Sequence, residues 1–177
     1  IGKDLRKTMV FVTHDQTEAL TFGEKIAVMS PNGRLLQFGS FDEIYHRPSH
    51  EFVGFFIGFP GMNVINATLD EDVLDLGPFQ IRIRRIKELP LKKGSYLKVG
   101  IRPEHIKISN VSKEDYLPFK VIYVEGLGRG KSIIHLQNER LVIKAMYEDE
   151  IPVGSQVWVK FDEEYLNFFD ESGTRIM

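Results

Sequence analysis

Short apolar runs alternate with polar stretches over the first 58 residues, in a pattern typical of mixed α/β structure. Residues 9–13 are apolar and rich in β-forming side chains, which predicts a strand buried on both faces. Residues 15–22 follow with helical spacing, and residues 25–29 predict a second strand. A strand, a helix and a strand this closely spaced predict a right-handed crossover with the two strands parallel.

The same pattern continues with a hairpin and two short helices. Pro31-Asn32-Gly33 is a turn signal, after which residues 34–38 predict an antiparallel return strand. Ser40 is the expected N-cap of a short helix ending at Tyr45, and Ser49 that of a helix over residues 50–57. The first part of the chain is therefore predicted to be an α/β unit made of strand, helix, strand, hairpin and helices.

Gly58-Phe59-Pro60-Gly61 is the clearest domain boundary, and it predicts domains over residues 1–58 and 59–177. Beyond it the apolar runs are short, evenly spaced and separated by turn residues, which favours an all-β barrel or sandwich. The expected strands cover residues 62–69, 73–76, 79–84, 96–101, 105–108, 119–124, 132–136, 141–146, 156–161 and 166–169.

Composition narrows the function classes. A formal net charge of −2 and a pI of about 6.2 do not favour a nucleic-acid or membrane-surface binder. The absence of cysteine excludes disulfides, thiolate metal sites and cysteine nucleophiles. No apolar run approaches the length of roughly 20 residues needed to span a bilayer, so we expect no direct membrane insertion. The first residues lack the pattern of a secretory signal.

His14 is the leading candidate for chemistry. It lies where the predicted strand ends and the helix begins, the position at which open α/β sheets bind their ligands. A neutral imidazole there can donate a hydrogen bond to a phosphate oxygen or orient a water molecule. Either Thr13 with Gln16 or Asp15 with Glu18 has the spacing of a capping box. The spacing alone favours a histidine that only ends a strand.

A second candidate, Gly130-Lys131-Ser132, nearly spells a phosphate-binding loop. Glu125 stands where that motif requires glycine, and the β-branched residues that follow favour a strand over the helix that the motif needs. We therefore interpret residues 126–132 as a hairpin or interdomain loop.

Three further features have structural interpretations. The basic residues Arg82, Arg84, Arg85, Lys87, Lys92 and Lys93 alternate with apolar side chains and lie among acids, which favours a solvated strand face over a nucleic-acid groove. His46 and His50 have helical spacing, but Pro48 interrupts the helix, so no metal site is predicted. Arg102-Pro103-Glu104 predicts a rigid corner whose charged side chains satisfy backbone groups or each other.

Several motifs together resemble one family, the ATPase subunits of ABC importers of the maltose and sugar-uptake type. The loop Thr13-His14-Asp15-Gln16 with Glu18-Ala19 is similar to the family's switch-histidine loop. The other similar segments, in the family's order, are residues 45–48, 52–58, 62–63, 100–105 and 169–175.

The resemblance implies the C-terminal part of such a subunit: the tail of the nucleotide-binding domain, then an OB-like regulatory domain. It implies ATP-driven import of a solute, and we expect that solute to be a carbohydrate. It also implies that the parent subunit uses ATP and Mg²⁺, with His14 contacting the γ-phosphate. It also implies partners, namely a second ATPase subunit joined through the β-domain and transmembrane permease subunits. The expected location is the inner face of the cell membrane. A free-standing OB-like binder of small ligands or nucleic acid is the alternative.

Other ATPase motifs are absent from the 177 residues. There is no acceptable phosphate loop, no Leu-Ser-Gly-Gly-Gln signature, and no apolar strand ending in Asp-Glu for magnesium. One histidine without these parts does not catalyse phosphoryl transfer, so we expect this chain alone to bind and hydrolyse no ATP. The resemblance places a further strand beside residues 9–13. Without it that strand would be an open edge, along which two copies of the chain are expected to pair.

Overall fold

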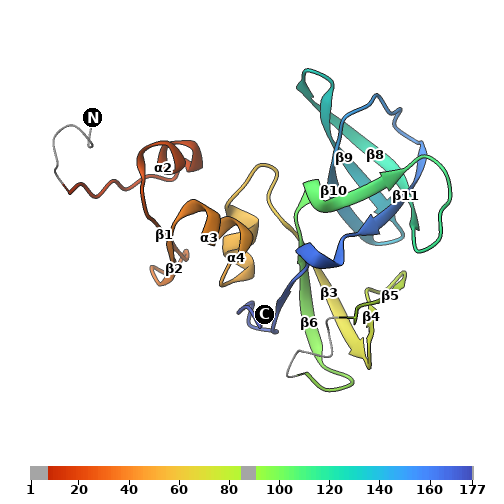
Figure 1. The fold of residues 1–177 in the computed structure, drawn as a ribbon, viewed down its shortest axis with the longest axis horizontal. Coiled ribbons are helices and arrows are strands. Elements are labelled where there is room, and N and C mark those ends of the chain that lie inside the picture. The colour runs from red at the N-terminus through yellow and green to blue at the C-terminus, as the bar shows by residue number, and fades with distance from the viewer. Residues whose placement is uncertain (1–7, 85–90, 177) are drawn as a thin grey trace.

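The computed structural model describes residues 8–84 and 91–176, and shows a small helical part followed by a larger β part (Figure 1). The first part contains a short helix, a two-stranded antiparallel hairpin and two more short helices. These elements are α2 (Gln16–Phe22), β1 (Ile26–Met29), β2 (Leu35–Gly39), α3 (Phe41–His46) and α4 (Glu51–Phe56). They share a small core centred on Ile44, Val53 and Ile57.

The strand expected at residues 9–13 does not form. The segment is extended without strand hydrogen bonds, and Val10 and Val12 are 90% and 89% exposed. The predicted parallel crossover is therefore wrong for this structure, since β1 pairs with β2 alone in a two-stranded sheet. The physical reason is that a strand needs a neighbour to receive its N–H and C=O groups.

The caps of α3 and α4 show why these helices begin where they do. The Ser40 hydroxyl accepts from the Glu43 amide while the Glu43 carboxylate accepts from the Ser40 amide, completing a capping box. The Ser40 amide and hydroxyl and the nearby Lys25 ammonium lower the pKa of Glu43 to about 2. The predicted Ser49 cap of α4 is wrong by one residue. His50 is the N-cap, its Nδ1 accepting from the Phe52 amide at 3.0 Å, while the Ser49 hydroxyl donates to Leu36.

The β part consists of two five-stranded antiparallel sheets, with strand orders β10-β9-β8-β11-β7 and β12-β6-β3-β4-β5. Every strand predicted for this part has a counterpart. They are β3 (Asn63–Asp70), β4 (Val73–Asp75), β5 (Gln80–Arg82), β6 (Tyr96–Ile101), β7 (Ile106–Ser109), β8 (Leu117–Gly128), β9 (Lys131–Asn138), β10 (Leu141–Tyr147), β11 (Gln156–Phe161) and β12 (Asn167–Phe169).

One continuous hydrophobic core fills the space between these sheets. Leu74, Val99, Ile134 and Val159 are each fully buried there, because alternate residues of every strand face inward. The Asn63 side chain closes one corner by acting as a peptide mimic toward β10. Its amide nitrogen donates to the carbonyl of Lys144 at 2.8 Å, and its oxygen accepts from the Lys144 amide at 2.7 Å. The all-β character expected for this part is therefore confirmed.

Candidate functional site

The His14 loop is built by capping interactions around the start of α2. Asp15 is the N-cap, and its carboxylate accepts from the amides of Thr17 and Glu18 at 2.7 and 3.3 Å. Thr13 Oγ1 accepts from the Asp15 amide and donates to Glu18 Oε2 at 2.6 Å. His14 stands exposed at the bend between these two capping residues. The loop therefore presents one imidazole to solvent from a well-braced turn.

These residues do not by themselves form a cradle for the phosphates of ATP. The Asp15 carboxylate already occupies the first free amides of α2, which are the groups that would otherwise hold an anion. Asp15 and Glu18 also add negative charge beside His14. The role implied for His14 stays a prediction, and the remainder of a nucleotide site would have to come from outside these residues.

The Gly-Lys-Ser segment is a β-hairpin turn, as predicted. Gly128, Arg129 and Gly130 all have positive φ, and strand β9 starts at Lys131. The Lys131 ammonium lies 3.3 Å from the Glu148 carboxylate and so is paired with an acid. Without a helix after the glycines, this segment lacks the amide array of a phosphate loop.

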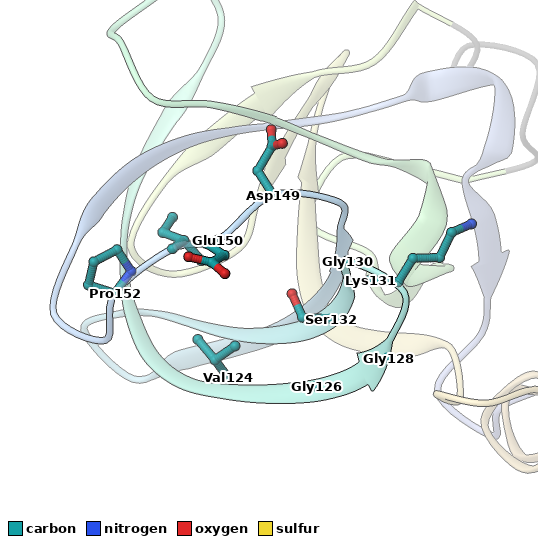
Figure 2. Close-up of a pocket in the computed structure, with 10 residues that line it drawn as sticks. Val124, Gly126, Gly128, Gly130, Lys131, Ser132, Asp149, Glu150 and Pro152 are labelled. Carbon is teal, nitrogen blue, oxygen red and sulfur yellow. The ribbon is translucent and has the colours of Figure 1, made fainter.

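A pocket of about 510 Å³ lies between this hairpin and the segment that leads into β11. Figure 2 shows the Ser132 hydroxyl in the middle of the view, the Glu150 side chain on the side of Pro152 and Val124, and Lys131 directed away. Asp149 and Glu150 add negative charge to its lining, which opposes the binding of phosphate.

The contact between the helical part and the β part is the most highly organised polar site that the structure shows. Its centre is Arg102, at the end of β6, whose side chain is 3% exposed. Two of its nitrogens, Nε and Nη2, donate to the carbonyl of Tyr45 at 3.1 and 2.8 Å. The third, Nη1, donates to the carbonyl of Ile57 at 2.6 Å and to that of Gly54 at 3.4 Å. One fork of donors from the β part thus satisfies the C-terminal ends of both α3 and α4.

The Tyr45 ring completes this arrangement. The Arg102 guanidinium carbon lies 3.5 Å from the ring centroid, and the Tyr45 hydroxyl donates to the Glu104 carboxylate. Burial lowers the pKa of Arg102, so the three carbonyls and the ring compensate a charge held largely away from water. The expectation that Arg102 satisfies backbone groups is confirmed, with the difference that those groups lie in the other part of the chain.

Further contacts join α4 to β6 and the C-terminal segment. The Lys98 ammonium pairs with the Glu51 carboxylate, both side chains being about three-quarters buried. The amide of Glu51 donates to the carbonyl of Gly173, and the amide of Arg175 donates to the carbonyl of Ser49. Gly173 and Arg175 therefore bind the start of α4 through backbone hydrogen bonds and hold the helical part against the β part.

Burial and the hydrogen bond to Glu104 raise the pKa of Tyr45 to about 12. Because the folded-state pKa lies above the usual value of about 10, this phenol favours the folded state below pH 10, and that contribution is lost as the pH rises toward 12. In a titration of phenolate absorbance, we expect the last of the six tyrosines to ionise near pH 12.

The Tyr45→Phe variant should lack that last step, and Glu104→Gln should shift it to lower pH. If the highest transition persisted unchanged in Tyr45→Phe, the raised pKa would belong to another tyrosine and the assignment would be wrong.

The other candidates have structural roles where the structure describes them. Arg82 pairs with Asp72 at 3.6 Å and Lys93 with Asp70 at 2.7 Å, as expected for a solvated strand face, while Arg85 and Lys87 lie outside the described residues. His50 caps α4. Among residues 8–84 and 91–176, no cluster of three His, Asp or Glu side chains suits a metal ion, and no helix is long and apolar enough to cross a membrane.

Comparison with known proteins identifies the relatives of this chain. Residues 58–106 match the family model of the MalK OB-fold domain. The chain is 34% identical to the sn-glycerol-3-phosphate import ATP-binding protein UgpC of Psychromonas ingrahamii, over 96% of this chain and 46% of that protein. It is 35% identical to the trehalose/maltose import ATP-binding protein MalK of Thermococcus litoralis, over 97% of this chain and 49% of that protein. The chain is a homologue of importer ATP-binding proteins.

This relationship confirms the resemblance inferred from the motifs, and it includes the helical part as well as the β-domain. The chain spans about half the length of the curated relatives that it matches. Among solved structures, the cytoplasmic molybdate-binding protein ModG aligns with a TM-score of 0.49 and 12% identity, over 61% of this chain and 95% of that one. A likeness at this level carries no argument about ligands.

Proposed function

We propose that this chain forms the C-terminal part of the ATP-binding subunit of an ABC importer. The observation that carries the proposal is the similarity to UgpC and MalK proteins, which extends over nearly the whole chain and includes the His14 loop. Residues 1–58 would complete the nucleotide-binding domain, and residues 59–177 would form the regulatory domain. The separate small core of the helical part and the single core of the β part support this division.

In the complete subunit, His14 would face the γ-phosphate of ATP with its Mg²⁺. An exposed imidazole between two capping residues supports this role, because its orientation is set by a braced turn while its nitrogens remain free to contact a ligand. The two relatives are named for import of sn-glycerol-3-phosphate and of trehalose or maltose. A carbohydrate or a related polyol phosphate is thus the solute class that we propose.

The β-domain would mediate regulation and pairing of two ATP-binding subunits, while transmembrane permease subunits hold the assembly at the inner face of the membrane. This arrangement accords with a chain whose described helices include none suited to span a bilayer.

A chimera tests the proposal. The corresponding half of UgpC from Salmonella choleraesuis, 32% identical to this chain, would be replaced by these 177 residues. We expect the chimera to hydrolyse ATP and to restore glycerol-phosphate uptake in cells that lack their own protein. His14→Ala should lower hydrolysis by about 10²-fold or more, the usual effect of losing a positioned proton-transfer or hydrogen-bonding group.

The exposed His46 provides a matched control, since His46→Ala removes an imidazole without touching the loop. Both substitutions should change the free energy of unfolding by less than about 0.5 kcal/mol, as surface changes usually do. A His14→Ala chimera that hydrolyses ATP at the unmodified rate would refute the role of His14. A folded chimera with no hydrolysis at all would refute the proposed function.

A further inference from the structure

Gln16 is the first residue of α2 and lies two residues after His14. Helix α2 has no fully buried residue, and the hydrogen bonds of Thr13, Asp15 and Thr21 stay within the loop and helix. Gln16 reaches further. Its Oε1 accepts from the amide of Gly58 at 2.9 Å, across 42 residues of sequence. This bond attaches the first turn of α2 to the segment that joins the two parts of the chain.

The amide that Gln16 holds belongs to the same peptide group as a carbonyl held by Arg102. The N–H of Gly58 donates to Gln16, and the C=O of Ile57 accepts from Arg102 Nη1 at 2.6 Å. Because a peptide group is planar and rigid, a displacement imposed on its oxygen also moves its N–H. Hydrogen bonds at the two ends of one peptide also polarise each other in the same sense.

Gly58 leaves little freedom for this peptide to move independently of Arg102. Its φ is +113°, and a Cβ atom there would lie 2.7 Å from Arg102 Nη1 and 3.0 Å from the Tyr45 ring. On the other side, Gln16 and Gly58 line a cleft of about 250 Å³ together with Glu125, Ile133 and Lys144 of strands β8, β9 and β10. The Ile57–Gly58 peptide is thus tightly packed on the side of Arg102, while a cleft lies on its other side. A shift of the β-domain therefore has room to displace this peptide.

We propose that Gln16 and Arg102, through the Ile57–Gly58 peptide, couple the position of the β-domain to the His14 loop. Gln16 is a positioning residue: it acts on His14 through the first turn of α2. The functional meaning of this coupling rests on the proposed ATPase role of His14, whereas the physical coupling itself is a property of this chain.

Amide hydrogen exchange on the chain itself tests the physical coupling. Gln16→Leu removes the acceptor at nearly constant volume, and Gln16→Glu keeps an oxygen in reach. We expect exchange at Gly58 to rise about tenfold in Gln16→Leu, the equivalent of one hydrogen bond of about 1.4 kcal/mol, and to change little in Gln16→Glu. Unchanged exchange at Gly58 in Gln16→Leu would show that the bond does not exist in solution.

Arg102→Lys tests transmission from the other side. It keeps the charge but loses the planar fork, so the Ile57 carbonyl is held less firmly. The amides of Ala19 and Gly23, which close the turns of α2, should then exchange several-fold faster although Arg102 does not touch α2. Lys98→Met is the matched control, because it breaks another contact between the two parts without touching the Ile57–Gly58 peptide. Equal effects of the two variants on α2 would refute a specific connection.

In the chimera, Gln16→Leu should lower kcat for ATP hydrolysis several-fold with little change in KM for ATP, and Gln16→Glu should restore it. An active chimera in which Gln16→Leu left kcat unchanged would overturn the positioning role. If the unsubstituted chimera did not hydrolyse ATP, the proposed function would fail, while the exchange measurements would still decide whether the coupling exists.

Discussion

Replacing Arg102 with methionine is expected to lower the free energy of unfolding by about 3–5 kcal/mol. The losses are about 1–3 kcal/mol for each of two buried carbonyls left without a donor and about 1–2 kcal/mol for the lost stacking on Tyr45, which together exceed the net effect because removing the desolvated charge is favourable. The Tyr45 carbonyl loses both of its guanidinium bonds, and the Ile57 carbonyl loses its contact at 2.6 Å. Gly54 loses less, because its carbonyl also accepts from the amide of Met62. Relief of the desolvated charge offsets part of the loss.

The order in which signals disappear on unfolding makes this prediction specific. Trp158 is the single tryptophan and lies on β11, so its fluorescence reports on the β part alone. Far-ultraviolet circular dichroism also contains the signal of α2, α3 and α4. In urea titrations of Arg102→Met, the helical signal should be lost at lower urea concentration than the Trp158 signal.

Arg82→Met is the control for this experiment. Its side chain is 73% exposed in an ion pair with Asp72, so its removal should cost less than about 1 kcal/mol. Coincident transitions for both signals in Arg102→Met, at the midpoint of the unsubstituted chain, would contradict the role given to Arg102.

The strands of the β-domain could be predicted in detail because the features that define them lie within each short segment of sequence. Inward and outward positions alternate along each strand, and Gly, Asn and Asp mark the turns, so residues 96–101 and 156–161 agree with β6 and β11 to the residue. The pairing of strands across the two sheets, and the closure by Asn63 against β10, depend on which segments meet in space. The periodicity of the sequence does not indicate which segments pair.

Residues 9–13 show the opposite case. Their composition is that of a strand, yet a strand is a property of a pair, and no partner for them forms within the described residues. Whether a second copy pairs with this segment stays a prediction.

The N-cap of α4 differs from the prediction for a related reason. The hydroxyl of Ser49 is drawn to the Leu36 carbonyl by tertiary contact, which leaves His50 to cap the helix.

The contact between the helical part and the β part could be predicted only in part. The sequence Gly100-Ile101-Arg102-Pro103-Glu104 predicts a rigid corner. The carbonyls that Arg102 satisfies could not be named, because they lie 45 to 57 residues earlier in the chain. Gln16 has the sequence context of a capping residue. Its contact with Gly58 appears only when the ends of α2 and α4 are brought together by folding.

Met62 fills the space between α4 and β6, and its replacement by alanine is expected to cost about 2–5 kcal/mol, the usual range for a buried methionine. The side chain is 2% exposed and packs against two glycines, Gly54 on α4 and Gly100 on β6. A Cβ atom at Gly54 would overlap the Met62 methyl group, and its next neighbour, Pro48 Cγ, would be at an ordinary 3.4 Å.

These contacts predict a reversal of sign in a double-mutant cycle. Gly54→Ala alone should destabilise the chain by about 1–2 kcal/mol, because overpacking against Met62 exceeds the gain of about 1 kcal/mol from placing alanine in a helix. In the Met62→Ala background the clash is gone, so the same substitution should stabilise the chain by about 1 kcal/mol, giving a coupling energy of about 2–3 kcal/mol.

Gly100→Ala provides the comparison that isolates this effect. A Cβ atom there would lie 2.7 Å from the Met62 methyl carbon and 2.8 Å from Phe169 Cε2, so shortening Met62 removes only one of two obstructions. Phe169 is fully buried and has no room to withdraw. In urea titrations of the unsubstituted chain, the three single variants and the two double variants, Met62→Ala should therefore rescue Gly54→Ala and leave Gly100→Ala destabilising. Additive effects at Gly54 would show that Met62 does not occupy the space that this glycine leaves open.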